Sequence, residues 1–184
     1  MTHAVPDQLV ISEGKKYGVR TALVVPPVVV GKGEGPLKKL SMTLPWYVDL
    51  VKKRGRGFRV GRGENITSTV HVRDLSAALI LLVEEALKDG GGSADWGETG
   101  VYYVENGGHA FDDLTREVVR WIAKQNMIVS DNVDQLGVEE AKKIHPWADL
   151  LWGYNMRVRG ERIEKLGWKA KEGNVFETIP ELLS

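Results

Sequence analysis

The chain has 184 residues, which fits one ordinary domain, and 42% hydrophobic with 27% charged residues is the composition of a folded protein with a sizeable core. Twenty-five Lys and Arg balance twenty-five Asp and Glu, so the basic excess typical of nucleic-acid-binding proteins is absent. Cysteine is absent, which excludes disulfides, thiolate nucleophiles and Cys-ligated zinc. No apolar run approaches the roughly 18–20 residues that span a bilayer. Residues 1–7 show no signal peptide, so we expect a cytoplasmic protein. The balanced charge and the short apolar runs predict that it binds neither nucleic acid nor membranes.

The first third of the chain predicts a helix, a strand, a loop and a second helix. Residues 7–17 have a helical pattern that ends at a glycine, and residues 19–25 are almost continuously apolar, which is typical of a buried strand in a parallel sheet. The glycines of residues 27–36 indicate a loop with tight turns. A helix is predicted over residues 43–53, with cations at its C-terminal end.

The rest of the chain alternates between strands and helices. A short strand within residues 55–65 and another over 67–72 precede a helix over 75–87, for which Asp74 is the predicted N-cap. The remaining elements are a strand over residues 100–105 and helices over 112–125, 138–144 and 155–166. This alternation predicts the α/β class. Only three or four strands are visible, which is few for a self-sufficient sheet.

Four segments, in order along the chain, carry a resemblance to a known family. The first is the strand Lys-Tyr-Gly-Val-Arg-Thr-Ala-Leu-Val-Val-Pro-Pro at residues 16–27, which leads into the glycine-rich loop. The others read Val-His-Val-Arg-Asp-Leu at residues 70–75, Val-Tyr-Tyr-Val-Glu-Asn-Gly at 101–107 and Arg-Ile-Glu-Lys-Leu-Gly-Trp at 162–168. Their order and spacing resemble the C-terminal, substrate-binding half of the extended short-chain dehydrogenase/reductases, the NAD-dependent epimerase/dehydratase group. The resemblance covers nearly the whole chain. It implies an incomplete Rossmann-type sheet with a small substrate-binding lobe, in one α/β unit over residues 1–184 that lacks the N-terminal dinucleotide-binding half.

Two departures from the family pattern concern the cofactor and the chemistry. The family's glycine-rich phosphate loop is missing, because the nearest candidate, residues 31–35, is followed by Pro36 and opens no helix. The resemblance implies NAD(P) for a full-length relative, whereas we expect no cofactor on this chain alone. The family's Tyr-x-x-x-Lys pair is replaced as well, since the corresponding stretch holds His3 and Asp7.

Three residues are candidates for catalysis. His3 and Asp7 have the spacing of an imidazole oriented by a carboxylate, which would make a general base, or they belong to an N-terminal segment of no consequence. His71 precedes a predicted helix and borders the substrate pocket in the resembled family, although a hydrogen-bonded structural histidine fits the same position. The four histidines show no metal-ligand spacing, so no metal site is predicted.

A substrate pocket is predicted where the carboxyl ends of the parallel strands meet. It would lie between residues 26–36, residues 70–74 and the final helix. Its candidate residues are Pro27, Gly31, Arg73, Arg157 and Arg159. The arginines would hold an anionic or carbonyl-bearing substrate, or they form surface ion pairs with neighbouring glutamates.

Two functions remain open from the sequence. The first is the substrate-binding half, as a fragment or truncated relative, of an NAD(P)-dependent oxidoreductase or epimerase that acts on a small metabolite. The second is an autonomous cofactor-free isomerase or cyclase, or a non-catalytic binding module. In both cases we expect the buried strand to find its missing neighbours in a second copy of the chain or in the missing N-terminal half.

Overall fold

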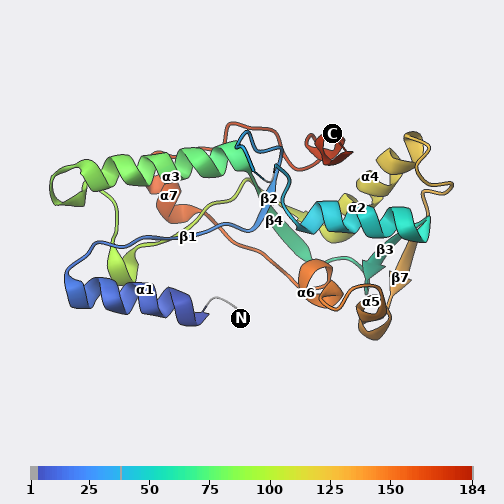
Figure 1. Cartoon of the computed structure of the whole chain (residues 1–184), viewed down its shortest axis with the longest axis horizontal. Helices are drawn as coiled ribbons and strands as arrows, with labels where there is room; N and C mark the ends of the chain where they lie inside the picture. The colour runs from blue at the N-terminus through green and yellow to red at the C-terminus, as the bar shows by residue number, and fades with distance from the viewer. Residues whose placement is uncertain (1–3, 38, 184) are drawn as a thin grey trace.

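The computed structural model describes residues 4–37 and 39–183, and its helices and strands alternate along an elongated molecule (Figure 1). The α-helices are α1 (Ala4–Tyr17), α2 (Thr43–Arg54), α3 (Val72–Leu87), α4 (Phe111–Lys124), α5 (Val138–Ile144), α6 (Ala148–Trp152) and α7 (Glu161–Lys165). The strands are β1 (Leu23–Val25), β2 (Val28–Val30), β3 (Gly57–Val60), β4 (Ile66–His71), β5 (Val101–Tyr103), β6 (Gly108–Ala110) and β7 (Val133–Leu136). The α/β class predicted from the sequence is confirmed.

The described residues form three small sheets, in which parallel pairs predominate. β1 pairs in parallel with β5, and β3 pairs in parallel with β7. β2 pairs in parallel with β4, whose first half pairs antiparallel with β6. Figure 1 shows α1 and α3 on either side of the β1–β5 pair, whereas α2, α4, α5 and α6 gather around β3 and β7. None of the helices in this described part is both long and apolar enough to cross a bilayer.

The strand predicted over residues 19–25 differs from the prediction in length and burial. Only Leu23–Val25 is a strand, and all three of its residues are half-buried. After the break at Pro26 and Pro27, the chain forms β2 where the sequence predicted a loop. Proline supplies no backbone N–H to a ladder, so the two prolines separate β1, which pairs with β5, from β2, which pairs with β4. Three β-branched valines then suit β2 to the pleated ladder with β4.

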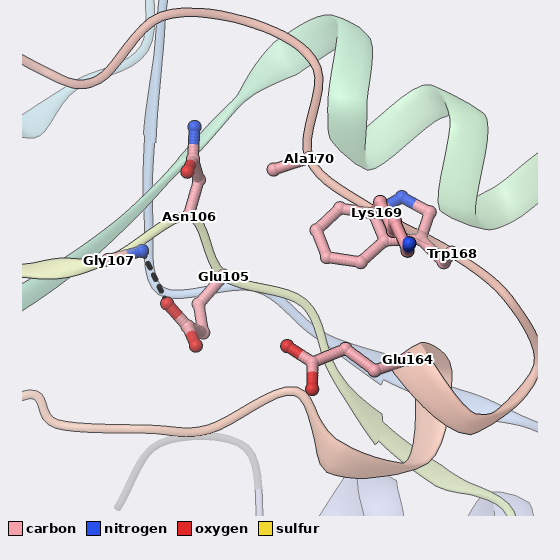
Figure 2. Close-up of a pocket in the computed structure, with 7 residues that line it drawn as sticks. All are labelled: Glu105, Asn106, Gly107, Glu164, Trp168, Lys169 and Ala170. Atoms are coloured by element: carbon pink, nitrogen blue, oxygen red, sulfur yellow. Dashed lines mark hydrogen bonds between the residues drawn. The ribbon is translucent and has the colours of Figure 1, made fainter.

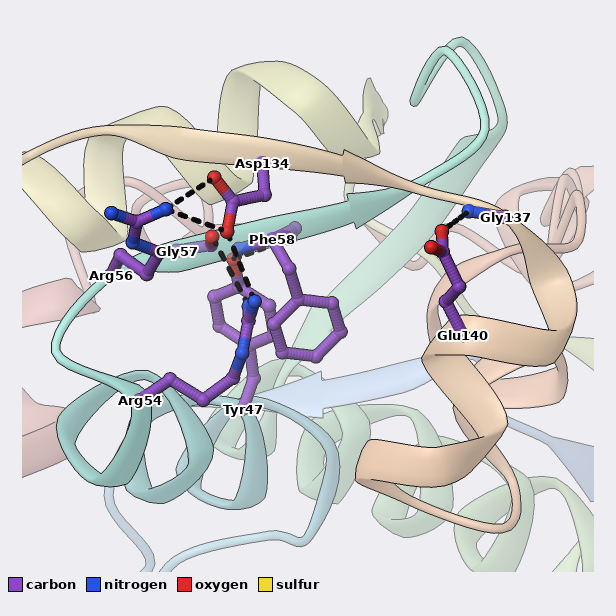
Figure 3. Close-up of polar contacts among 8 residues, drawn as sticks. All are labelled: Tyr47, Arg54, Arg56, Gly57, Phe58, Asp134, Gly137 and Glu140. Carbon is purple, nitrogen blue, oxygen red and sulfur yellow. Dashed lines mark hydrogen bonds and ion pairs between the residues drawn. The ribbon is translucent and has the colours of Figure 1, made fainter.

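The larger of two hydrophobic cores holds an aromatic group between α2 and β3. Tyr47 and Phe58 are at most 1% exposed, and their rings pack at 5.0 Å. The Tyr47 hydroxyl donates to the Phe58 carbonyl at 2.7 Å and accepts from the Phe58 N–H at 3.1 Å (Figure 3). Burial raises the pKa of Tyr47 to about 12, against the weaker effect of its hydrogen bonds. Arg54 also bonds Asp134 of β7, at 3.0 Å, so α2, β3 and β7 are tied at one corner.

The chain after β3 departs from prediction in three further places. Residues 155–166 are not one helix: α7 spans only Glu161–Lys165, and Met156 instead bridges Thr67 of β4. The short elements β6, β7 and α6 were not predicted. Finally, α3 begins at Val72 with His71 as its N-cap, so the prediction of Asp74 as the cap is wrong. Asp74 lies within the first turn of that helix, where its carboxylate accepts backbone N–H groups of the C-terminal segment.

Candidate functional site

A cavity of about 400 Å³ opens at the carboxyl ends of β2 and β4. These strands are parallel, with Val30 opposite His71, so the residues that follow them come to the same edge. The loop after β2 forms one wall, the first turn of α3 forms another, and a residue of the C-terminal segment closes the third. The lining residues are Lys32, Gly33, Glu34, Lys39, His71, Arg73 and Glu181.

His71 is the buried polar group of this cavity, with 5% of its surface exposed. Its Nδ1 accepts the backbone N–H of Arg73 at 3.2 Å and so caps α3. Because Nδ1 is the acceptor, a neutral His71 ring carries its proton on Nε2. Within residues 4–37 and 39–183, Nε2 has no hydrogen-bond partner. The Nε2 N–H of His71 is therefore an unused donor that solvent, or a ligand, can reach.

Gly31 leaves room for the imidazole of His71 because it has no side chain. Its backbone φ is +82°, a conformation that favours glycine. A Cβ at this position would lie 2.1 Å from Nε2 of His71 and 2.5 Å from its Cδ2. The ring thus fills the space that any other residue at position 31 would need. Two predicted site residues, far apart in sequence, are in direct contact here.

Arg73 connects three segments at the mouth of the cavity. Its Nη2 lies 2.6 Å from Glu34 Oε1 and its Nη1 lies 3.7 Å from Glu172 Oε2. The hydrogen bond and charge of Glu34, and the charge of Glu172, raise the pKa of the Arg73 guanidinium above its already high value. With 56% of its side chain exposed, Arg73 keeps donors toward solvent.

Asp74 fixes the C-terminal segment over the start of α3. Its carboxylate, 3% exposed, accepts the backbone N–H groups of Lys171 at 2.9 Å and Glu172 at 3.2 Å. Its backbone carbonyl accepts the indole N–H of Trp168 at 3.1 Å. Sequence reasoning treated Asp74 as a helix cap and missed this positioning role. Nothing local in the sequence signals it, because the partners lie about a hundred residues away.

A second cavity, of about 410 Å³, lies beside the residues that follow β5. Figure 2 shows the carboxylates of Glu105 and Glu164 reaching into the space from opposite walls, with the Trp168 ring above them. Glu105 is held by the backbone N–H of Gly107. Lys169 adds a positive charge to the same lining. The usable signal for this cavity is the Glu-Asn-Gly run at the carboxyl end of β5.

The other predicted site residues lie away from the His71 cavity. Pro27 stands between β1 and β2, and Arg157 and Arg159 lie exposed in the extended segment before α7. None of these three lines the cavity, so the predicted third wall was wrong and Glu181 takes its place. Asp7 lies in the first turn of α1 with no polar contact to a described residue. His3 lies outside the described residues, so the proposed His3–Asp7 pair has no geometry to assess.

The site chemistry is that of oxyanion or carbonyl recognition. His71, Arg73 and Lys39 are donors around one space, and they are the residue types that hold carboxylates and carbonyl oxygens. In the described part of the chain, no group of three or more His, Asp or Glu could hold a metal ion. The glycine loop after β2 is not followed directly by a helix, because α2 begins only at Thr43, so this loop does not form a helix N-terminus of the kind that holds a phosphate group.

Comparisons with known proteins support the same architecture. No family model matches the chain. An oxidase, ucsJ, from an Acremonium species is 32% identical over 158 residues, which are 82% of this chain and 45% of the oxidase. This chain therefore spans about half the length of the relative.

Solved structures show the same proportion. The dTDP-glucose 4,6-dehydratase DesIV of Streptomyces venezuelae, with NAD bound, matches 95% of this chain over 47% of its own length, at 18% identity and a TM-score of 0.59. A UDP-N-acetylglucosamine 4-epimerase of Methanobrevibacter ruminantium matches 98% of this chain over 50% of its own, at 16% identity and a TM-score of 0.63. The resemblance seen in the sequence is confirmed: this chain has the fold of one half of an extended short-chain dehydrogenase/reductase of the NAD-dependent epimerase/dehydratase type.

Proposed function

We propose that this chain is the substrate-binding half of an NAD(P)-dependent oxidoreductase or epimerase that acts on a small metabolite. The fold matches about half of each related enzyme, and the relatives include an oxidase, a dehydratase with NAD bound and an epimerase. The dinucleotide is held by the other half, since residues 4–37 and 39–183 contain no strand, glycine loop and helix in immediate succession. The His71 cavity is the substrate pocket.

The open edge of the β1–β5 pair carries this proposal. The Leu23 N–H donates to the Gly100 carbonyl at 2.8 Å. In β1, the backbone N–H and C=O groups of alternate residues therefore point toward β5. The backbone groups of Val24, between them, consequently face the opposite edge. Parallel sheets in folded proteins are usually covered on both faces, and an unpaired strand edge leaves backbone N–H and C=O groups without partners. An isolated pair of parallel strands is therefore rarely stable. A further parallel strand at this edge would complete a Rossmann-type sheet.

The helix over this pair also shows an uncovered apolar surface. On α3, Ala78 and Leu82 pack inward, whereas Leu79, Ile80 and Val83 are 46–58% exposed. These three residues recur at helical spacing and form one stripe. An exposed apolar stripe of this kind on the helix that packs over the pair is a surface that a second half-domain could cover.

The experiment supplies the missing half in trans. The remaining half of the Acremonium oxidase, expressed separately, should form a one-to-one complex with this chain, and the complex should bind NAD(H) or NADP(H) in calorimetric titration. Val83→Asp should weaken the complex tenfold or more, because it places a charge in the covered stripe. Val129→Asp is the control, since Val129 is fully exposed away from this sheet. Halves that stay separate, or a complex indifferent to Val83→Asp, would contradict the proposal.

One observation favours a second function, an autonomous binding module that needs no cofactor. The His71 cavity is lined by distant segments of this chain, from Lys32 to Glu181, so its walls come together without the dinucleotide-binding half. A module of this kind would bind its ligand with the same affinity whether or not the dinucleotide-binding half is present. In the half-enzyme, docking of the other half would change that affinity.

A further inference from the structure

The His71 cavity already holds a carboxylate of its own chain. Glu181, in the short 3-10 helix Ile179–Leu183, accepts the backbone N–H of Lys32 at 2.7 Å. The two residues are 149 positions apart, and both line the cavity. The loop after β2 thus presents a backbone donor to a carboxylate that arrives from the C-terminal segment.

Two further donors surround the same space. His71 is buried, and its Nε2, the protonated nitrogen of the neutral ring, has no partner among the described residues. Although the residue is largely buried, Nε2 itself is not sealed from solvent, so a ligand oxygen can reach its N–H. Arg73 stands beside it and keeps donors free of Glu34. The cavity therefore has more donors than the chain itself uses.

We propose that this cavity binds a small ligand through a carboxylate group, and that Glu181 occupies the carboxylate position in the free chain. The proposal rests on the proposed function for the identity of the cavity as a substrate pocket, and it names the class of substrate: a small carboxylic acid. The ligand carboxylate would take the Lys32 N–H from Glu181 and bond the donors of His71 and Arg73.

The charges of the lining favour a carboxylate over a phosphate. Glu34, Glu172 and Glu181 all lie within or beside this lining. A phosphate group carries close to two negative charges at neutral pH, so these carboxylates would repel it about twice as strongly as a single carboxylate. The group that the cavity already accommodates is itself a carboxylate.

If Glu181 occupies the ligand position, then removing its carboxylate should increase affinity. Succinate is the probe, titrated into the full chain by calorimetry, with the His71 imidazole resonances followed by NMR. We expect Glu181→Ala to bind succinate at least tenfold more tightly than the natural chain, and Glu181→Gln to fall between them. His71→Asn in the Glu181→Ala background should remove most of the gain, since asparagine still caps α3 but lacks the imidazole donor. Glu139→Gln, at an exposed carboxylate on α5, is the matched control and should change nothing.

Three results would overturn the proposal. They are an unchanged affinity in both Glu181 variants, a gain that survives His71→Asn, and inorganic phosphate binding more tightly than succinate. Should Glu181→Ala fail to fold, Glu181→Gln decides, because its amide oxygen still accepts the Lys32 N–H. The titration uses this chain alone without any dinucleotide. Its failure is therefore distinct from failure of the proposed half-enzyme, which is read from association with the other half.

Discussion

Replacing Gly31 with alanine should destabilise the protein through His71. A residue with a Cβ at a φ of +82° pays about 1–2 kcal/mol for the left-handed backbone. The new Cβ would also lie 2.1 Å from Nε2, against roughly 3.5–4.0 Å for an ordinary contact, and overpacking of this kind costs about 1–3 kcal/mol. The free energy of unfolding should therefore fall by about 2–5 kcal/mol. Urea unfolding followed by tryptophan fluorescence measures it directly.

The same loop offers a control, and His71 offers a test of mechanism. Gly35→Ala should leave stability almost unchanged, because no atom lies within 4 Å of a Cβ there and its φ is not in the left-handed region. In a His71→Ala background the cost of Gly31→Ala should shrink to the backbone part, about 1–2 kcal/mol, since the ring is gone. A cost that is the same in both backgrounds would refute the contact between Gly31 and His71 as its cause.

Three further outcomes are expected. Asp74→Ala should lower the free energy of unfolding by about 3 kcal/mol, because the backbone N–H groups of Lys171 and Glu172 lose their carboxylate acceptor at about 1.5 kcal/mol each; a loss no larger than that of the exposed Asp113→Ala would contradict this. The pKa of Tyr47 is about 12 in the folded state and about 10 in the unfolded state. Its contribution to the free energy of unfolding is therefore complete below pH 10 and is lost as the pH rises toward 12. Between pH 9 and 12, urea unfolding should show that the free energy of unfolding of the natural chain falls by about 2–3 kcal/mol more than that of Tyr47→Phe. Parallel pH profiles of the two proteins would be evidence against this. Calorimetric titration of the chain alone should detect no saturable micromolar binding of NAD(H) or NADP(H).

The long helices were predictable from sequence, because their signals are local. The helices over residues 43–53 and 75–87 are α2 and α3 within a few residues, since apolar periodicity and a glycine stop specify them. The three-residue strands β2 and β6 were not predictable, because three residues are too few for a periodic pattern and each strand depends on β4 for its pairing. Likewise, the helix predicted at residues 155–160 gives way to tertiary contacts: Val158 N–H donates to Ser68 Oγ at 3.2 Å.

The candidate site was half predictable. Parallel strands bring their carboxyl ends to one edge, and the structure accordingly has Gly31 against His71, with His71 and Arg73 in the cavity lining. Glu181 carried no local signal, because its role depends on where a distant 3-10 helix packs. Arg157 and Arg159 were assigned to the pocket only through a helix that does not form there.

The position of the cavity follows from how the strands are distributed between the β1–β5 pair and the β2–β4 pair. Pro26 and Pro27 transfer the chain from the β1–β5 pair to the β2–β4 pair, so the loop after β2 emerges beside His71 and not beside β5. The wall opposite that loop comes from the C-terminal segment, which Asp74 holds against the first turn of α3. Each wall therefore depends on a contact between residues about 40 to 150 positions apart, a separation that only the folded chain closes. Within that wall, Glu181 supplies the carboxylate that accepts the Lys32 N–H, so Glu181→Ala removes this carboxylate while the donors of His71 and Arg73 and the contacts of Asp74 stay in place.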